Sequence, residues 1–111
     1  MWRLALGVVL LGLALPTGAS ANDYPTDARA DYVFACMASN GETRQILKQC
    51  SCSIDVIASI LPYRQYVEAE TVMSMRQIGG EKGALFRSGP DMNAVIADLK
   101  RAQAEAEIRC F

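Results

Sequence analysis

The residues of this chain with the clearest chemistry are its four cysteines, which are Cys36, Cys50, Cys52 and Cys110. Two of them flank a single serine, and such a close pair of thiols could act as a redox dithiol or as half of a site for a soft metal ion. The one-residue gap differs from the two-residue gap of thioredoxin-like motifs. An even cysteine count in a small exported chain is typical of a disulfide framework, which is the interpretation that we favour.

The spacing of the cysteines restricts how they can pair. On a helix, Cys50 and Cys52 would project about 200° apart, so a bond between them would strain the backbone. Each must then pair with Cys36 or with Cys110. Cys36 lies five residues before Gly41 and Cys50 nine residues after it, the smaller mismatch for a helical hairpin that turns there. We therefore prefer Cys36–Cys50 with Cys52–Cys110, and the exchanged pairing is the alternative.

Other catalytic chemistry has little support in the sequence. The chain contains no histidine, which removes the usual general base and the usual partner of a serine or cysteine nucleophile. We therefore predict that the protein is not an enzyme. Asp55, Glu68 and Glu70 lie near the joint between two predicted helices and could offer oxygen ligands to a divalent or trivalent cation. No cofactor is expected apart from such a metal ion.

The first 21 residues have the pattern of a cleaved secretion signal. Arg3 supplies a positive start, residues 4–15 carry no polar side chain, and residues 19–21 are small enough for a signal peptidase. Such an apolar run is too short to cross a hydrocarbon core of ~30 Å comfortably, so a retained membrane anchor is the less favoured alternative. We expect residues 22–111 to form a single domain that is free in the periplasm.

The charge of that domain argues against two classes of partner. The chain has 11 Lys and Arg against 12 Asp and Glu, and removal of Arg3 with the signal leaves ten basic residues and a net charge of −2. The two signs are interspersed along the sequence. Such a surface gives no electrostatic reason to bind nucleic acid or an anionic membrane. We expect a protein of the periplasm as the partner.

Apolar residues recur at helical spacing throughout the domain, and no segment alternates as a half-buried strand does. The fold class that we predict is all-α, a small four-helix domain with two disulfides. Thr43 can cap the second helix, which is apolar around much of its circumference and should lie at the centre of the fold. Stop signals at Gly41, Pro62 and Gly79 and a start at Pro90 place the helices at residues 27–40, 44–61, 66–78 and 90–110.

The least regular stretch, residues 81–89, separates the last two predicted helices. It contains a short apolar patch with Leu85 and Phe86. These two side chains either cover an open end of the core or form a docking surface for a partner.

Several short stretches between residues 32 and 87 carry a likeness to known proteins. They are Tyr32 to Met37, Asn40-Gly41, Leu61 to Tyr63, Tyr66-Val67, Ala69 to Thr71, Met75 to Gln77 and, most specifically, the Cys-Ser-Cys-Ser-Ile-Asp run from Cys50 to Asp55. Together they resemble a family of small exported proteins of methylotrophic and related bacteria. The genes of that family accompany quinoprotein (PQQ-dependent) alcohol dehydrogenases. The resemblance implies an accessory role in periplasmic alcohol oxidation, in connection with the metal ion of those enzymes, and it assigns no catalytic residue.

A looser likeness links the chain to small helical acid-stress chaperones of the periplasm. Those proteins usually carry one disulfide, so four cysteines depart from their pattern. Two functional hypotheses follow from the sequence as a whole. The first is a non-enzymatic periplasmic accessory protein that docks on a larger partner. The second is a small metal-binding protein that uses carboxylates, or a thiol-redox protein that uses Cys50 and Cys52.

Overall fold

The computed structural model describes residues 23–87 and 89–111, and these residues form helices and no strand. The helices are α1 (Thr26–Asn40), α2 (Arg44–Ile60), α3 (Tyr63–Arg76), α4 (Gly80–Ala84) and α5 (Pro90–Cys110). The predicted all-α class with two disulfides is therefore confirmed. The predicted signal segment lies outside the described residues. Within the described part of the chain, no helix is long and apolar enough to cross a membrane.

Local sequence explains most of the helix ends. The Thr43 hydroxyl oxygen accepts a hydrogen bond from the Ile46 amide at 3.1 Å and so caps α2. Gly41 follows α1 with φ +120°, a conformation that side chains with a Cβ rarely adopt. Pro90 occupies the first turn of α5, where its missing amide proton is not needed.

Two elements differ from the sequence prediction. Helix α3 begins at Tyr63 instead of residue 66, because the Pro62 carbonyl already accepts a hydrogen bond from the Tyr66 amide at 3.1 Å. The stretch that we expected to be least regular contains the short helix α4. A turn of helix this short has no stability of its own, so it depends on contacts with its neighbours.

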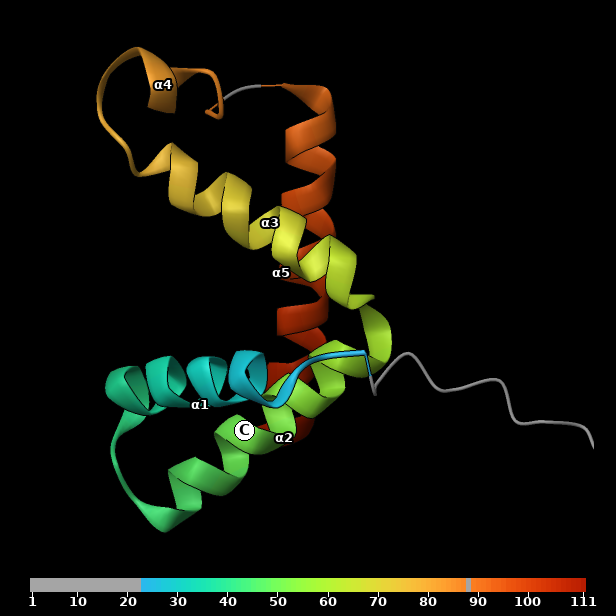
Figure 1. Cartoon of the computed structure of the whole chain (residues 1–111). Coiled ribbons are helices and arrows are strands. Elements are labelled where there is room, and N and C mark those ends of the chain that lie inside the picture. Colours follow the sequence, from blue (N-terminus) through green and yellow to red (C-terminus); the bar gives the residue numbers. More distant parts are fainter. Residues whose placement is uncertain (1–22, 88) are drawn as a thin grey trace, which may run out of the picture.

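Helix α5 connects two ends of the molecule (Figure 1). Helix α2 packs against α1 on one side and α5 on the other, whereas α3 packs on α5 and carries α4. We call α1, α2 and the C-terminal half of α5 the disulfide end, and α3, α4 and the N-terminal half of α5 the α3–α4 end. We expected all helices to surround α2, but α3 uses α5 as its main support instead.

The core lies where these helices cross. Ile57 and Leu99 are fully buried, and the cluster around them is completed by Tyr24, Ile54, Ala58, Leu61, Tyr66, Ala69, Ala102 and Ala106. The alanines let the helix backbones approach closely. No side chain of α1 is fully buried, although Tyr32 and Val33 pack partly against the cluster. Helix α1 is thus attached to the core more than it is part of it.

Candidate functional site

The four cysteines form structural links between helices. Cys36 is bonded to Cys50 with a Cα–Cα distance of 5.8 Å, and Cys52 is bonded to Cys110 with a distance of 5.7 Å. This is the pairing that the turn at Gly41 favoured. No cysteine is free in the described part of the chain, and Cys50 is completely buried. The Cys50-Ser51-Cys52 segment therefore holds two separate disulfides in this structure, and not a dithiol.

The three acidic residues considered as metal ligands lie on different surfaces. Asp55 is on α2, where its Oδ1 is 2.5 Å from Nη1 of Arg29 on α1. Glu68 and Glu70 are both on the surface of α3. Within residues 23–87 and 89–111, no group of three or more acidic or cysteine side chains is placed to hold a metal ion. The structure therefore does not assemble Asp55, Glu68 and Glu70 into a ligand set, and metal binding by them stays a prediction.

The apolar patch at the α3–α4 end is exposed in part. Leu85 is 71% exposed, whereas Phe86 is half-buried. The Phe86 carbonyl accepts a hydrogen bond from Nε of Arg76, and Nη2 of Arg76 donates to Oδ1 of Asn93 at 2.9 Å. Leu85 is therefore on the surface. The segment that carries it is held to α3 through Arg76, whose guanidinium also bonds to α5.

An apolar groove that no pattern in the sequence indicated runs between α1 and α2. It has a volume of about 440 Å³. We call it the α1–α2 groove, and its lining residues are Thr26, Arg29, Ala30, Val33, Phe34, Met37, Ser51, Ile54 and Asp55. Phe34 is 81% exposed, the most exposed of the large apolar side chains in the described residues. Phe34 lies next to the apolar stripe of α1 in the sequence. Whether its side chain is buried depends on how α2 packs against α1, which the sequence does not show.

A second concave surface lies between α1 and α3, and we call it the tyrosine cleft. It consists of two hollows of about 400 and 530 Å³ that share Asp31, Tyr66 and Glu70. The first also contacts Ala28, Tyr63, Val67, Thr71, Ser74 and Met75, and the second Tyr32, Ala35, Cys36, Ser39 and Asn40. Asp31 comes from the α1 wall and Glu70 from the α3 wall. Among the described residues, no basic side chain lines either hollow.

The rings behind the cleft form a compact aromatic group. The centroid of Tyr24 lies 5.0 Å from that of Tyr63 and 5.1 Å from that of Tyr66, with Tyr63 and Tyr66 stacked at 6.3 Å. The Tyr24 hydroxyl donates to the Leu61 carbonyl at 2.7 Å. The guanidinium carbon of Arg29 lies 5.7 Å from the Tyr24 centroid. Such contacts join the chain before α1 to the joint between α2 and α3.

The cleft changes the acidity of the groups that line it. Burial raises the pKa of Tyr66, and the negative charge of Glu70 raises it further. The same two causes raise the pKa of Tyr32, against a hydrogen bond with Ser53 that lowers it. Glu70 is exposed overall, but partial loss of water around its carboxyl group raises its own pKa. The carboxylate of Glu70 thus acts on both phenols from α3.

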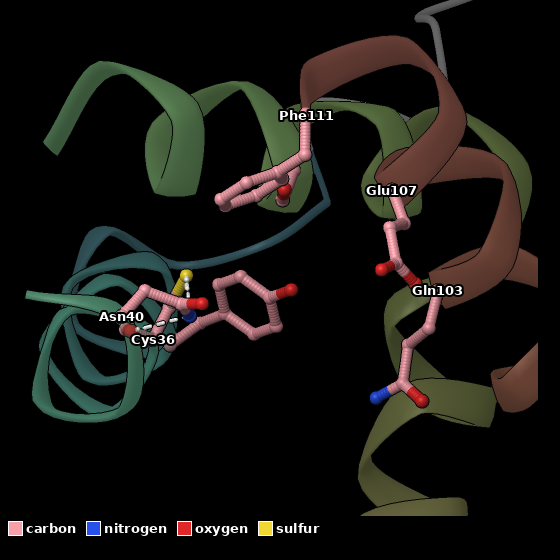
Figure 2. A pocket seen from close by; sticks show the side chains of 7 residues that line it. Cys36, Asn40, Gln103, Glu107 and Phe111 are labelled. Carbon is pink, nitrogen blue, oxygen red and sulfur yellow. Dashed lines mark hydrogen bonds between the residues drawn. The ribbon is translucent and has the colours of Figure 1, made fainter. Parts of the chain in front are cut away.

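The cleft continues toward α5 through a third, smaller hollow of about 200 Å³. Figure 2 shows Cys36 and Asn40 of α1 on one side, with Gln103 and Glu107 of α5 on the other. Nδ2 of Asn40 donates to the Cys36 carbonyl at 2.9 Å, so this amide is already partnered within its own helix. The hollow shares Tyr32, Cys36 and Asn40 with the tyrosine cleft and so adjoins it.

Comparisons with protein-family models, with curated proteins and with solved structures find no significant match to this chain. The resemblance to proteins that accompany quinoprotein dehydrogenases therefore stays a prediction.

Proposed function

We propose that the mature chain is a non-enzymatic accessory protein of the periplasm that binds a larger protein through the α1–α2 groove. The observation that carries this proposal is Phe34, which is 81% exposed beside a groove lined mainly by apolar side chains. Exposed apolar patches that are contiguous with a groove mark protein-binding surfaces. Association would remove the Phe34 ring and the groove walls from water.

The groove fits a short segment of a partner better than it fits a second copy of this chain. Nine residues line it, whereas a stable protein–protein interface takes about 20–30 residues on each side. A protruding apolar side chain or a single helical turn of the partner can fill such a space. The Arg29–Asp55 ion pair, whose side chains are 26% and 68% exposed, lies in the same groove and can orient the polar backbone of that segment.

The location and the first candidate partner come from different arguments. Disulfides persist in oxidising compartments such as the periplasm, and both bonds of this protein link helices of the core. The family resemblance points to a quinoprotein alcohol dehydrogenase as the first partner to test. That enzyme is larger than this 111-residue chain and would present the apolar segment.

Site-specific photo-crosslinking tests the groove directly. A photoreactive amino acid at position 34 is expected to join the protein to one larger periplasmic partner, which mass spectrometry identifies. The matched control is the same probe at position 108, because Ile108 is 79% exposed but does not line the groove. Equal products at positions 34 and 108, or products that contain only copies of this chain, would contradict the proposal.

Affinity measurements with the identified partner give the second test. Phe34→Ser is expected to weaken binding by about tenfold or more, because a buried aromatic anchor contributes about 1–3 kcal/mol to an interface. Ile108→Ser should leave the affinity unchanged. Purified quinoprotein alcohol dehydrogenase is measured in parallel, and a lack of binding to it would reject the dehydrogenase while leaving the groove open to another partner.

A further inference from the structure

The tyrosine cleft carries two negative charges and no positive one. Asp31 and Glu70 lie on its opposite walls, and neither takes part in any ion pair among the described residues. The ion pairs lie elsewhere, between Arg29 and Asp55 and within α5. The partial desolvation of Glu70 disfavours its carboxylate, and a cation that entered the cleft would remove that cost.

A largely buried phenol lines the same two hollows as these carboxylates. Tyr66 is only 9% exposed, and its side chain lines both hollows of the cleft. No residue in the described part of the chain forms a hydrogen bond with its hydroxyl group. Because no fully enclosed polar atom lacks a partner there, this hydroxyl retains some access to solvent, and the cleft is the concave surface that Tyr66 lines. The hydroxyl of this largely buried residue is therefore available to a ligand in the cleft.

The same aromatic group already holds one cation. The Arg29 guanidinium lies 5.7 Å from the centroid of Tyr24, within the range of a cation–π contact. Tyr63 and Tyr66, which contact Tyr24, also line the cleft. Tyrosine faces beside an unpaired carboxylate are the groups that recognise organic ammonium ions.

We propose that the tyrosine cleft binds a small organic ammonium ion, with Glu70 and Asp31 as its counter-charges and Tyr66 and Tyr63 as its aromatic wall. The hollows of about 400 and 530 Å³ fit a ligand of this size. A hard metal ion fits less well, since the described residues place no group of three acidic or cysteine side chains together. This site is separate from the α1–α2 groove and adds a ligand to the proposed function.

Titration of the whole mature protein with tetramethylammonium chloride, followed by two-dimensional NMR of backbone amides, tests the site. Saturable shifts are expected at Asp31, Tyr66 and Glu70. Sodium chloride at equal ionic strength controls for screening of surface charges. Tert-butanol, a neutral molecule of similar shape, controls for simple filling of an apolar hollow. Equal shifts with tert-butanol, or no saturable shifts with tetramethylammonium, would overturn the proposal.

A matched pair of variants separates the cleft from the general negative charge of the helix. Glu70→Gln is expected to weaken tetramethylammonium binding by about fivefold or more, the effect of losing a partly screened charge pair. Glu68→Gln removes the same charge from the same helix, but Glu68 does not line the cleft, so binding should be unchanged. Equal losses in both variants would reject the site. Phe34→Ser should not alter this binding, which keeps failure of the groove distinguishable from failure of the cleft.

The ammonium group could come from a free amine or from a lysine side chain of a protein. Butylammonium and a lysine blocked at both its amino and carboxyl ends distinguish these sources in the same titration. Tighter binding of blocked lysine would assign the cleft to a protein partner. Binding of butylammonium alone would assign it to a small primary amine. Binding of neither, with tetramethylammonium still bound, would assign it to a quaternary ammonium ion, whereas binding of none of the three would overturn the proposal.

Discussion

The two ends of this molecule are held together by different means. At the disulfide end, α1 is bonded to α2 through Cys36–Cys50, and α2 is bonded to α5 through Cys52–Cys110. The α3–α4 end has no disulfide within residues 63–87. There, Tyr66, Ala69 and Val72 of α3 are buried against the core. One bond thus holds the helix with the least burial, since α1 has no fully buried side chain. The other joins α2 to α5, which both contribute buried side chains to the core.

This difference explains why both candidate binding surfaces border α1. A helix that is retained by burial must turn its apolar side chains inward. Helix α1 is retained instead by Cys36 and by the Arg29–Asp55 ion pair, so Phe34 can face solvent. The α1–α2 groove and the tyrosine cleft lie on two sides of it. Covalent attachment therefore leaves a helix surface available for binding.

The largest expected effect comes from removing the covalent bonds. Replacing Cys52 and Cys110 by alanine opens a loop with a sequence separation of 58, and the chain-entropy estimate is a loss of about 4 kcal/mol of unfolding free energy. The shorter Cys36–Cys50 loop, with a separation of 14, should lose about 3 kcal/mol on the same estimate. Urea unfolding of the two double variants measures both. If the unfolding free energy falls by no more than it does for an ordinary surface substitution, the packing of buried side chains alone stabilises the disulfide end.

Substitution of Gly83 should destabilise the α3–α4 end and leave the disulfide end unchanged. A Cβ at Gly83 would lie 1.7 Å from the Ile78 carbonyl oxygen, so α4 must move. We expect Gly83→Ala to destabilise this segment by about 1–3 kcal/mol. Hydrogen exchange should then quicken in residues 78–87 and stay unchanged in α2. Gly79→Ala is the control, because a Cβ there meets nothing within 4 Å; equal exchange in both variants would contradict the prediction.

Tyr24 links the two ends, and its hydroxyl should contribute modestly. Tyr24→Phe removes the 2.7 Å hydrogen bond to the Leu61 carbonyl, at an expected cost of about 1 kcal/mol. Burial raises the pKa of Tyr24 from 10.0 to about 12. Wild-type stability should therefore fall as pH rises from about 10 through 12, since the unfolded state ionises first. The phenylalanine variant should show a shallower fall in thermal unfolding scans, and an identical fall would contradict the argument.

The smallest effect is expected in the tyrosine cleft. The pKa of Glu70 is raised above its ordinary 4.5, so its contribution to stability is full below that value and is lost as pH rises through the folded-state pKa. Glu70→Gln should consequently raise the melting temperature slightly at pH 7 and leave it unchanged near pH 3. Glu68→Gln is the control and should not show this pH-dependent gain. A lower melting temperature for Glu70→Gln at pH 7 would contradict this prediction, because it would mean that the folded protein stabilises the Glu70 carboxylate.

Local patterns were sufficient for much of the fold. The cap at Thr43, the stop at Gly41 and the start at Pro90 depend on neighbouring residues alone, and the structure has each of them. The turn at Gly41 makes α1 and α2 antiparallel, and the number of residues on each side of it was enough to favour the Cys36–Cys50 bond. Helix α4 was not predicted, because five residues with two glycines have no periodic pattern of their own. Its packing against α3 forms only after the chain has folded.

The amino-acid sequence by itself determined the helical class, most of the helix ends and the number of cysteines available for bonding, because these depend on short-range spacing. Only the tertiary structure decided that α3 would pack on α5, that Phe34 would be exposed and that Glu70 would face Asp31 across a cleft. Those outcomes depend on which helices share the core. A side chain's exposure and its partners are set by residues far away in the sequence, so no local pattern contains them.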